Sequence, residues 1–170
     1  MKKKTSSAGF TLIETFVAIT VLLTAIAGPL TIASKGLSSA MIARDQMTAF
    51  YLGQDAIEFI RHHKDTNALR SDPWLTGLSA CMSTLCTVDT KEDVLTSCGT
   101  SCPPLRYNDE SGFFSYNLLD DETNFTRSVK ITPANAEDNI EVTVEASVSW
   151  TAVNGLVRNF TVREHLFDWQ

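Results

Sequence analysis

The strongest constraint on this 170-residue chain is an apolar run near its N-terminus. From Phe10 to Ala33 the only ionisable residue is Glu14. A helix of that length rises about 36 Å at about 1.5 Å per residue, which is enough to cross a hydrocarbon core of about 30 Å. Lysines occupy positions 2–4, and by the positive-inside rule they stay in the cytoplasm. The run therefore predicts a single membrane pass with the C-terminal bulk outside.

Three interpretations of this segment are open. A cleaved secretory signal is favoured by the Ala-Ile-Ala exit at 25–27. Such a signal has an apolar stretch of about 7–15 residues, however, and this run is longer, contains Glu14 and is followed closely by Pro29. An uncleaved signal anchor fits the length but gives no reason for the carboxylate. In the third interpretation, a short basic leader is cut between Gly9 and Phe10.

Glu14 distinguishes these interpretations by its electrostatics. An ionisable side chain in a membrane helix costs about 2.5–3.5 kcal/mol on insertion scales, and such residues usually mark function with a partner nearby. The helix macrodipole returns only about 0.3–1 kcal/mol to an acid near the N-terminus. A cut after Gly9 would create a new α-amino group four residues before Glu14, in the same chain or in a neighbour. The acid therefore favours the third interpretation.

Residues 9–14 read Gly-Phe-Thr-Leu-Ile-Glu, after a Lys-rich leader and before an apolar helix. This pattern resembles the class III prepilin signal of type IV pilins and type II secretion pseudopilins. The resemblance implies that a membrane-embedded aspartyl peptidase, the prepilin peptidase, cuts after Gly9 and methylates the amine of Phe10. It also implies that Glu14 guides assembly into a filament. It covers the N-terminal third strongly and the rest loosely.

The helix is expected to continue well beyond the membrane. Apolar residues recur at steps of three and four after Ser34, which predicts one helix from about Phe10 to about Lys64. Its first half, 10–33, is expected in the membrane or filament core, and its second half, 34–66, against a globular domain. Gly28 and Pro29 predict a kink, because proline removes a backbone hydrogen bond. The resemblance implies that such a stretch is often unwound in filaments.

Residues 67–110 form a turn-rich region that holds all four cysteines, Cys81, Cys86, Cys98 and Cys102. Short apolar runs at 86–88 and 94–95 predict a small hairpin, and Trp74 and Leu75 are expected to pack the region onto the domain. The spacing lacks the Cys-x2-Cys of a zinc knuckle, so two disulfides are favoured in an oxidising compartment. Spacing leaves three connectivities open, and we favour the nested one, Cys81–Cys102 with Cys86–Cys98.

Residues 111–170 predict an antiparallel β-sheet. Strands are expected at 113–119, 128–131, 141–151 and 156–167, and the third alternates cleanly between apolar and polar residues. Apolar faces stay in phase if Trp150 pairs with Phe160 and Val148 with Val162, across a three-residue loop with Gly155 near a bulge. The expected fold class is α+β, a long helix whose outer half packs on this sheet. The resemblance implies the pilin fold.

Other candidate sites have simpler interpretations. The acidic clusters at 109–110, 120–122 and 137–138 lack the alternating ligands of a calcium loop and are read as solvated turns. His62 and His63 are neighbours on a helix and point about 100° apart, which disfavours a shared metal ion. The sequons at Asn124 and Asn159 are interpreted as chance matches.

Composition and motifs exclude whole classes of function. Net charge is −6, or −9 without the three N-terminal lysines, and there is no basic stripe of the kind that nucleic acid requires. There is no nucleophile elbow, phosphate loop or metalloprotease motif, so neither an enzyme nor a cofactor is expected.

The resulting hypothesis is a structural filament subunit, with leader 1–9, that serves adhesion, DNA uptake or secretion. It would be anchored in the cytoplasmic membrane with its C-terminal domain outside, and later built into an extracellular filament with other subunits. The Trp150-Thr151 hairpin and the Asp-Trp at 168–169 also resemble minor pilins and minor pseudopilins, which favours a minor subunit. The alternative is a signal-anchored, monomeric extracellular binding or adhesion domain.

Overall fold

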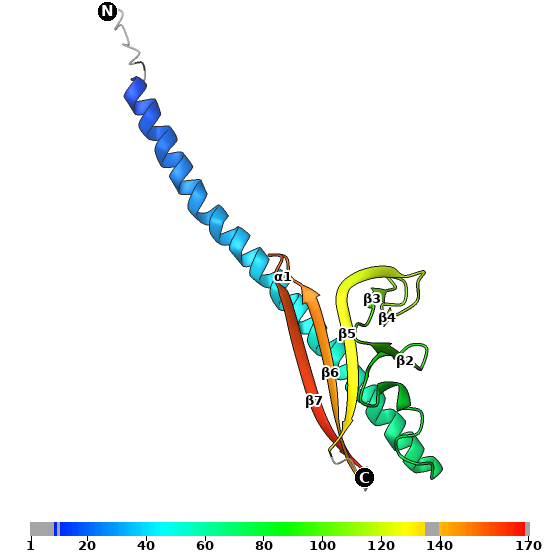
Figure 1. The fold of residues 1–170 in the computed structure, drawn as a ribbon. Coiled ribbons are helices and arrows are strands. Elements are labelled where there is room, and N and C mark those ends of the chain that lie inside the picture. Colours follow the sequence, from blue (N-terminus) through cyan, green and yellow to red (C-terminus); the bar gives the residue numbers. More distant parts are fainter. Residues whose placement is uncertain (1–8, 10, 135–139, 169–170) are drawn as a thin grey trace, which may run out of the picture. The chain divides into compact units, whose positions relative to one another are not determined.

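A computed structural model describes residue 9, residues 11–134 and residues 140–168. The chain is α+β, with one long N-terminal helix and an antiparallel sheet (Figure 1). It forms two compact units, Met1–Met41 and Ile42–Gln170, which are here called the N-terminal segment and the outer unit.

Helix α1 runs from Leu12 to Arg70, past the end expected near Lys64. It remains α-helical through Pro29, so the kink and any unwinding stay predictions. The helix ends in a left-handed turn at Ser71, whose φ is +59°. The Ser71 N–H donates to the Ala68 carbonyl (3.2 Å) and the Asp72 N–H donates to the Asn67 carbonyl (3.0 Å), the two bonds of a Schellman motif. The termination signal is therefore local.

The short strands after α1 follow a 3-10 turn, η1 (Ser79–Cys81). The hairpin expected from the two short apolar runs is confirmed as β1 (Leu85–Asp89) paired with β2 (Val94–Gly99). Next come β3 (Pro104–Tyr107) and β4 (Phe114–Ser115). The strand expected over 113–119 is much shorter than predicted, because the chain turns at Leu118 and Leu119, where the Asp120 N–H donates to the Asn117 carbonyl (3.1 Å).

Three long strands complete the sheet: β5 (Asp121–Pro133), β6 (Glu141–Thr151) and β7 (Val157–Phe167). Strand β6 lies between β5 and β7. The other side of β5 pairs with β3 near its start and with β1 farther along. Strand β5 is longer than the predicted 128–131, because β1, β3 and β6 all hydrogen-bond to it. In Figure 1, β7 and the β3–β4 pair lie at opposite edges of the sheet.

The predicted register between β6 and β7 is wrong by two residues. Trp150 lies opposite Arg158 rather than Phe160. The expected three-residue loop is present: the Gly155 N–H donates to the Ala152 carbonyl (2.8 Å), and Gly155 has a φ of +76°. A two-residue shift keeps every apolar side chain on its face, so alternation cannot choose between the two registers. The choice follows from the loop, whose last residue must adopt positive φ.

The outer half of α1 packs on one face of the sheet, as predicted. Its fully buried residues include Ala49, Ala56 and Ile60, which meet the alternating apolar face of β6. Gly53 allows a close approach, because a Cβ built there would lie 3.3 Å from Val162 Cγ1 in β7. Trp74 is buried in the same core and Leu75 packs against it, which confirms the expectation for the loop. Arg61 of α1 also binds both carboxylate oxygens of Glu164 in β7 (2.6 Å).

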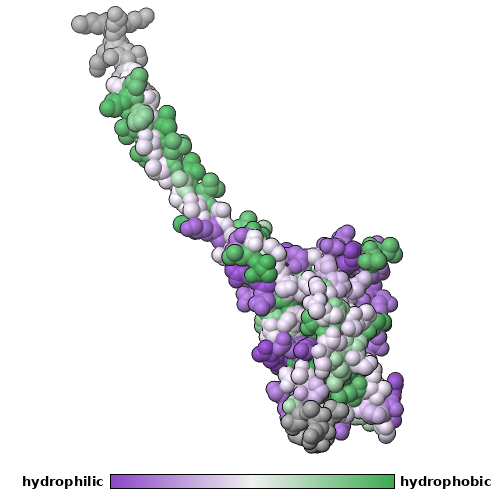
Figure 2. All heavy atoms as spheres, in the orientation of Figure 1, coloured by the Kyte–Doolittle hydropathy of each residue, from purple (hydrophilic) through white to green (hydrophobic). Residues whose placement is uncertain are grey.

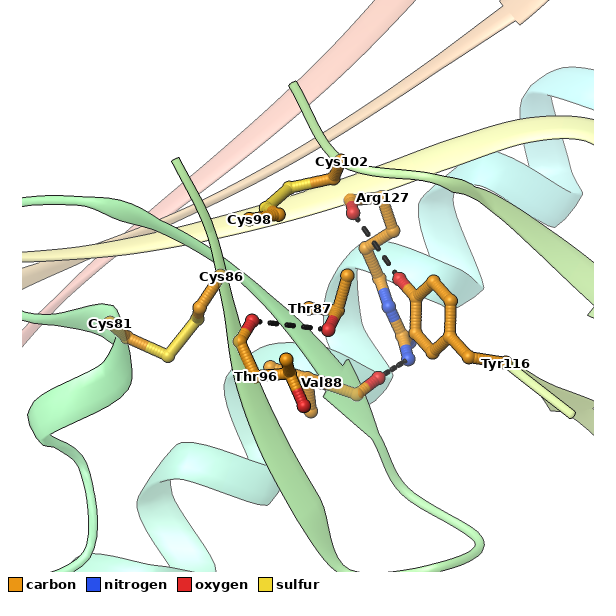
Figure 3. Close-up of a disulfide and its surroundings, with 9 residues drawn as sticks. All are labelled: Cys81, Cys86, Thr87, Val88, Thr96, Cys98, Cys102, Tyr116 and Arg127. Carbon is orange, nitrogen blue, oxygen red and sulfur yellow. Dashed lines mark hydrogen bonds between the residues drawn. A yellow bond between two sulfur atoms is a disulfide. The ribbon is translucent and has the colours of Figure 1, made fainter. Parts of the chain in front are cut away.

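The cysteines form two sequential disulfides, Cys81–Cys86 and Cys98–Cys102, and the nested pairing is wrong (Figure 3). Both bridges join Cα atoms 4.9 Å apart. In the β1–β2 hairpin Cys86 lies opposite Ser97, and the register shifts between Leu85 and Cys86. Cys98 is therefore not opposite Cys86. Cys86 is instead buried against η1, where Cys81 is also buried.

Candidate functional site

The N-terminal segment is the first candidate site because its apolar side chains are uncovered. Every described residue from Thr11 to Leu37 is exposed, including Leu12 at 87% and Leu30 at 67%. Figure 2 shows hydrophobic residues along this part of the helix. By length and composition this helix can cross a membrane, a property that signal sequences share. An exposed apolar surface of this extent is typical of a site that contacts a membrane or another protein.

The threonines of this segment are already satisfied by the helix. Thr15 donates its hydroxyl to the Leu12 carbonyl and Thr20 to the Phe16 carbonyl, each at 2.8 Å. Thr24 and Thr31 bond in the same way to carbonyls four residues earlier. A hydroxyl that donates within its own helix can face an apolar environment without an unpaired donor. The threonine hydroxyls therefore do not prevent this segment from being buried in an apolar environment.

Glu14 is different. Among the residues that the structure describes, none donates a hydrogen bond to its carboxylate or forms an ion pair with it. Its backbone N–H donates to the hydroxyl of Thr11 (3.3 Å), which makes Thr11 the N-cap of α1. Sequence reasoning missed this cap, although Thr-x-x-Glu is the signature of a capping box. The reciprocal bond from the Thr11 N–H to the Glu14 carboxylate is not formed among the described residues, so the acid remains available.

The predicted leader junction lies just before the helix. Gly9 is exposed and non-helical, and a Cβ placed on it would meet nothing within 4 Å. Phe10, the residue expected after the cut, lies outside the described residues. The Gly9 side of the junction is therefore sterically open.

A buried arginine in the outer unit is the polar feature that the sequence did not reveal. Arg127 of β5 is fully buried, and its Nη1 donates to the Leu52 carbonyl (3.0 Å) and to Asp55 Oδ2 (2.8 Å). Its Nη2 donates to the Val88 carbonyl (Figure 3). One side chain thus ties α1, β1 and β5 together. Burial raises the pKa of the Tyr116 phenol, which donates to the Arg127 carbonyl (3.3 Å).

The remaining candidates do not converge on a metal site. His62 is exposed, whereas His63 stacks on Phe59 and its Nε2 lies 3.8 Å from Asp93. Within the described ranges, no three histidine, cysteine or acidic side chains are placed to hold an ion. The acids at 109–110 are exposed, and those at 137–138 lie outside the described residues.

Two of the three acids at 120–122 have partners within the unit. Asn108 and Ser115 donate to the Asp120 carboxylate and lower its pKa, and Arg106 pairs with Glu122. Asn124 donates to the Thr151 carbonyl, and Asn159 is exposed on β7.

The fold and the site define the class of protein only broadly: an α+β chain with a bare apolar helix and a disulfide-containing outer unit. Comparison with known protein families, with curated proteins and with solved structures returned no match.

Proposed function

We propose that this chain is a structural subunit, of the minor kind, of a type IV pilus or of a related pseudopilus filament. One observation carries the proposal: Glu14 is the only ionisable residue between Phe10 and Ala33, and no described residue neutralises it. The threonines around it are satisfied internally, so the acid alone requires an outside partner.

The partner that fits is a newly made chain terminus. Hydrolysis of the Gly9–Phe10 bond consumes one water, leaves a carboxylate on the leader and leaves an ammonium on Phe10. Methylation by the prepilin peptidase would take a methyl group from a sulfonium donor, which leaves as a thioether, and would turn the neutral amine into a secondary ammonium, so the terminus keeps its positive charge. Opposite charges a few ångströms apart attract strongly where water is excluded. The Glu14 carboxylate would therefore draw in the amine of its own chain or of a neighbouring subunit.

The outer unit is compatible with this function. A single pass leaves it outside, in a compartment where both disulfides persist. Before assembly the apolar segment would lie in the cytoplasmic membrane, and afterwards it would lie among the helices of other subunits. Either environment covers side chains such as Leu12 and Leu30, which the chain itself leaves exposed.

Intact mass and N-terminal sequencing of the protein isolated from cells test the first step. The expected mature chain begins at Phe10 with a methylated amine. A chain that keeps its lysines would indicate the signal-anchored monomer, and a chain that begins after Ala27 would indicate ordinary secretion. Either result would contradict the proposal that this chain is a filament subunit.

Glu14→Gln tests the second step, because it removes the charge and keeps the shape. Incorporation into filaments should fall about tenfold or more, the factor that corresponds to roughly 1.4 kcal/mol of lost attraction. Cleavage and the unfolding of the outer unit should not change. Thr20→Val is the matched control, because it removes a satisfied hydroxyl from the same segment. Normal incorporation of Glu14→Gln would contradict the mechanism.

A further inference from the structure

A small polar cavity lies at the β7 edge of the outer unit. It has a volume of about 300 Å³ and is lined by Gln46, Trp150, Val157, Arg158, Asn159 and Phe160. The Trp150 indole N–H and the Arg158 Nε–H are buried donors without an acceptor among the described residues. The two residues lie opposite each other on β6 and β7. We call this cavity the Arg158 pocket.

The Arg158 pocket has the chemistry of a carboxylate site. A buried donor without an acceptor has lost its hydrogen bonds to water and gained none in return, so the Trp150 indole N–H and the Arg158 Nε–H need an explanation. Arg158 forms no ion pair in the described part of a chain that has 20 acidic residues. An arginine in a partly desolvated pocket binds a carboxylate through charge-assisted hydrogen bonds. A carboxylate entering the pocket would lie beside the guanidinium of Arg158, one of the residues that line it.

The surface around the Arg158 pocket indicates that this carboxylate belongs to a protein. The adjoining β6–β7 loop exposes Val153 (60%) and Leu156 (59%), and Val157, the first residue of β7, is also exposed (76%). Three exposed apolar side chains beside a polar pocket are typical of a protein interface rather than of a site for a free ion.

A complementary surface lies on the same unit. Asp121 at the start of β5 has no side-chain partner among the described residues, unlike its neighbours Asp120 and Glu122. The turn before it exposes Leu118 (81%) and Leu119 (92%). We call Leu118, Leu119 and Asp121 the acidic knob. An unpaired acid flanked by apolar residues matches an unpaired arginine flanked by apolar residues.

The two surfaces lie at the same end of the sheet but at opposite edges. Phe125 of β5 pairs with Trp150, which in turn pairs with Arg158, so these three residues lie side by side across the sheet. Asp121 lies four residues before Phe125, on the stretch of β5 that pairs with β3. Because one surface is at the β7 edge and the other is beside β3 and β4, they cannot meet within one copy. A contact between copies would therefore join the Arg158 pocket of one copy to the other surface on its neighbour.

We propose that the Arg158 pocket of one copy binds the acidic knob of a second copy, with Asp121 as the carboxylate. This inference deepens the proposed function by naming a lateral contact between outer units. It uses neither Phe10 nor Glu14, so it can fail or succeed independently of leader cleavage.

Photo-crosslinking of the full chain in cells tests it, with a photoreactive phenylalanine at Val157. Two copies with different isotope labels separate a contact between copies from one within a chain. The expected adduct joins Val157 to the tryptic peptide of residues 107–127 of the other copy. An adduct elsewhere on the second copy, to another protein or to lipid alone, or no adduct at all, would overturn the proposal.

Charge reversal makes the test specific. Arg158→Glu and Asp121→Arg should each reduce the adduct about tenfold, and the double variant should recover at least half of it. Leu119→Ser should reduce it several-fold, and because Leu119 is 92% exposed this change does not endanger folding. Glu110→Arg, a reversal at an exposed acid nearby, is the control and should leave the adduct unchanged. Failure of the double variant to recover, with both disulfides intact by mass, would refute the pairing of Arg158 with Asp121.

Discussion

Two stretches of the same helix have opposite environments. Leu23 in the N-terminal segment is 62% exposed, whereas Ile60 in the outer unit is fully buried. Both are large apolar side chains in one continuous helix, so hydrophobicity does not separate them. The difference is that the sheet covers one face of the outer half, whereas no residue in the described ranges covers the first half. Apolar surface that a chain leaves uncovered has its partner outside the chain, which is the basis of the proposed function.

The largest expected effect is a loss of stability of the outer unit that does not involve the N-terminal segment. Arg127→Ala should lower the free energy of unfolding of the outer unit by about 3–5 kcal/mol, because it removes a fully buried side chain whose hydrogen bonds join α1, β1 and β5 and leaves a cavity in its place. Chemical denaturation of the full chain in detergent measures this. Arg163→Ala, at an exposed pair with Glu145, is the control and should cost at most about 1 kcal/mol.

The same substitution in the two stretches sharpens the comparison. Ile60→Ala should destabilise the outer unit by about 2–5 kcal/mol, the cost of a cavity in a packed core. Leu23→Ala should leave the unfolding midpoint of that unit unchanged, because no core residue covers Leu23. Equal effects of the two changes would show that the two stretches are not independent.

The disulfides should contribute about 2 kcal/mol each, because they close loops of only five and four residues. Removing Cys81–Cys86 as a double alanine variant should cost more than removing Cys98–Cys102, because both sulfurs of the first bridge are in the core. Denaturation curves of the two variants under oxidising conditions test the order. A larger loss from the Cys98–Cys102 variant would contradict it.

The pairing of the four cysteines can be tested separately from stability. Trypsin cleaves after Lys91, between the two bridges. Sequential pairing predicts that peptides 71–91 and 92–106 separate without reduction, each with one internal disulfide. Nested pairing would keep them linked, and mass spectrometry distinguishes the two results.

The smallest expected effect is a loss of stability in acid that is confined to the outer unit. Hydrogen bonds from Asn108 and Ser115 hold the pKa of Asp120 below its ordinary value of about 3.9. A group with a lowered folded-state pKa stabilises the fold above its unfolded pKa and loses that contribution as the pH falls through the folded value. Stability should therefore decline below about pH 4. Asn108→Ala should weaken this dependence, as denaturation midpoints between about pH 2.5 and 5 would show; an unchanged slope would assign it to other acids.

The sequence predicted the elements better than the contacts between them. The alternation of apolar and polar residues predicted both ends of β6 correctly. The apolar run near the N-terminus predicted the start of α1 to within two residues. The predicted register between β6 and β7 was wrong because a shift of two residues leaves every apolar side chain on the same face of the sheet. The alternation of apolar and polar residues therefore cannot distinguish registers that differ by an even number of residues. The nested disulfide was wrong because the register of the β1–β2 hairpin places Ser97, rather than Cys98, opposite Cys86. Arg127 was missed, since its partners Leu52 and Asp55 precede it by more than 70 residues.

The sequence by itself determined the bare apolar helix, the lone acid within it and the two periodicities that make an α+β chain. These follow from local rules, because a side chain's face and a helix's length depend only on nearby residues. Tertiary structure decided which cysteines pair, which arginine is buried and which surfaces lie at opposite edges of the sheet. Those outcomes depend on contacts between residues distant in sequence, whose energies exist only once the helix has docked on the sheet.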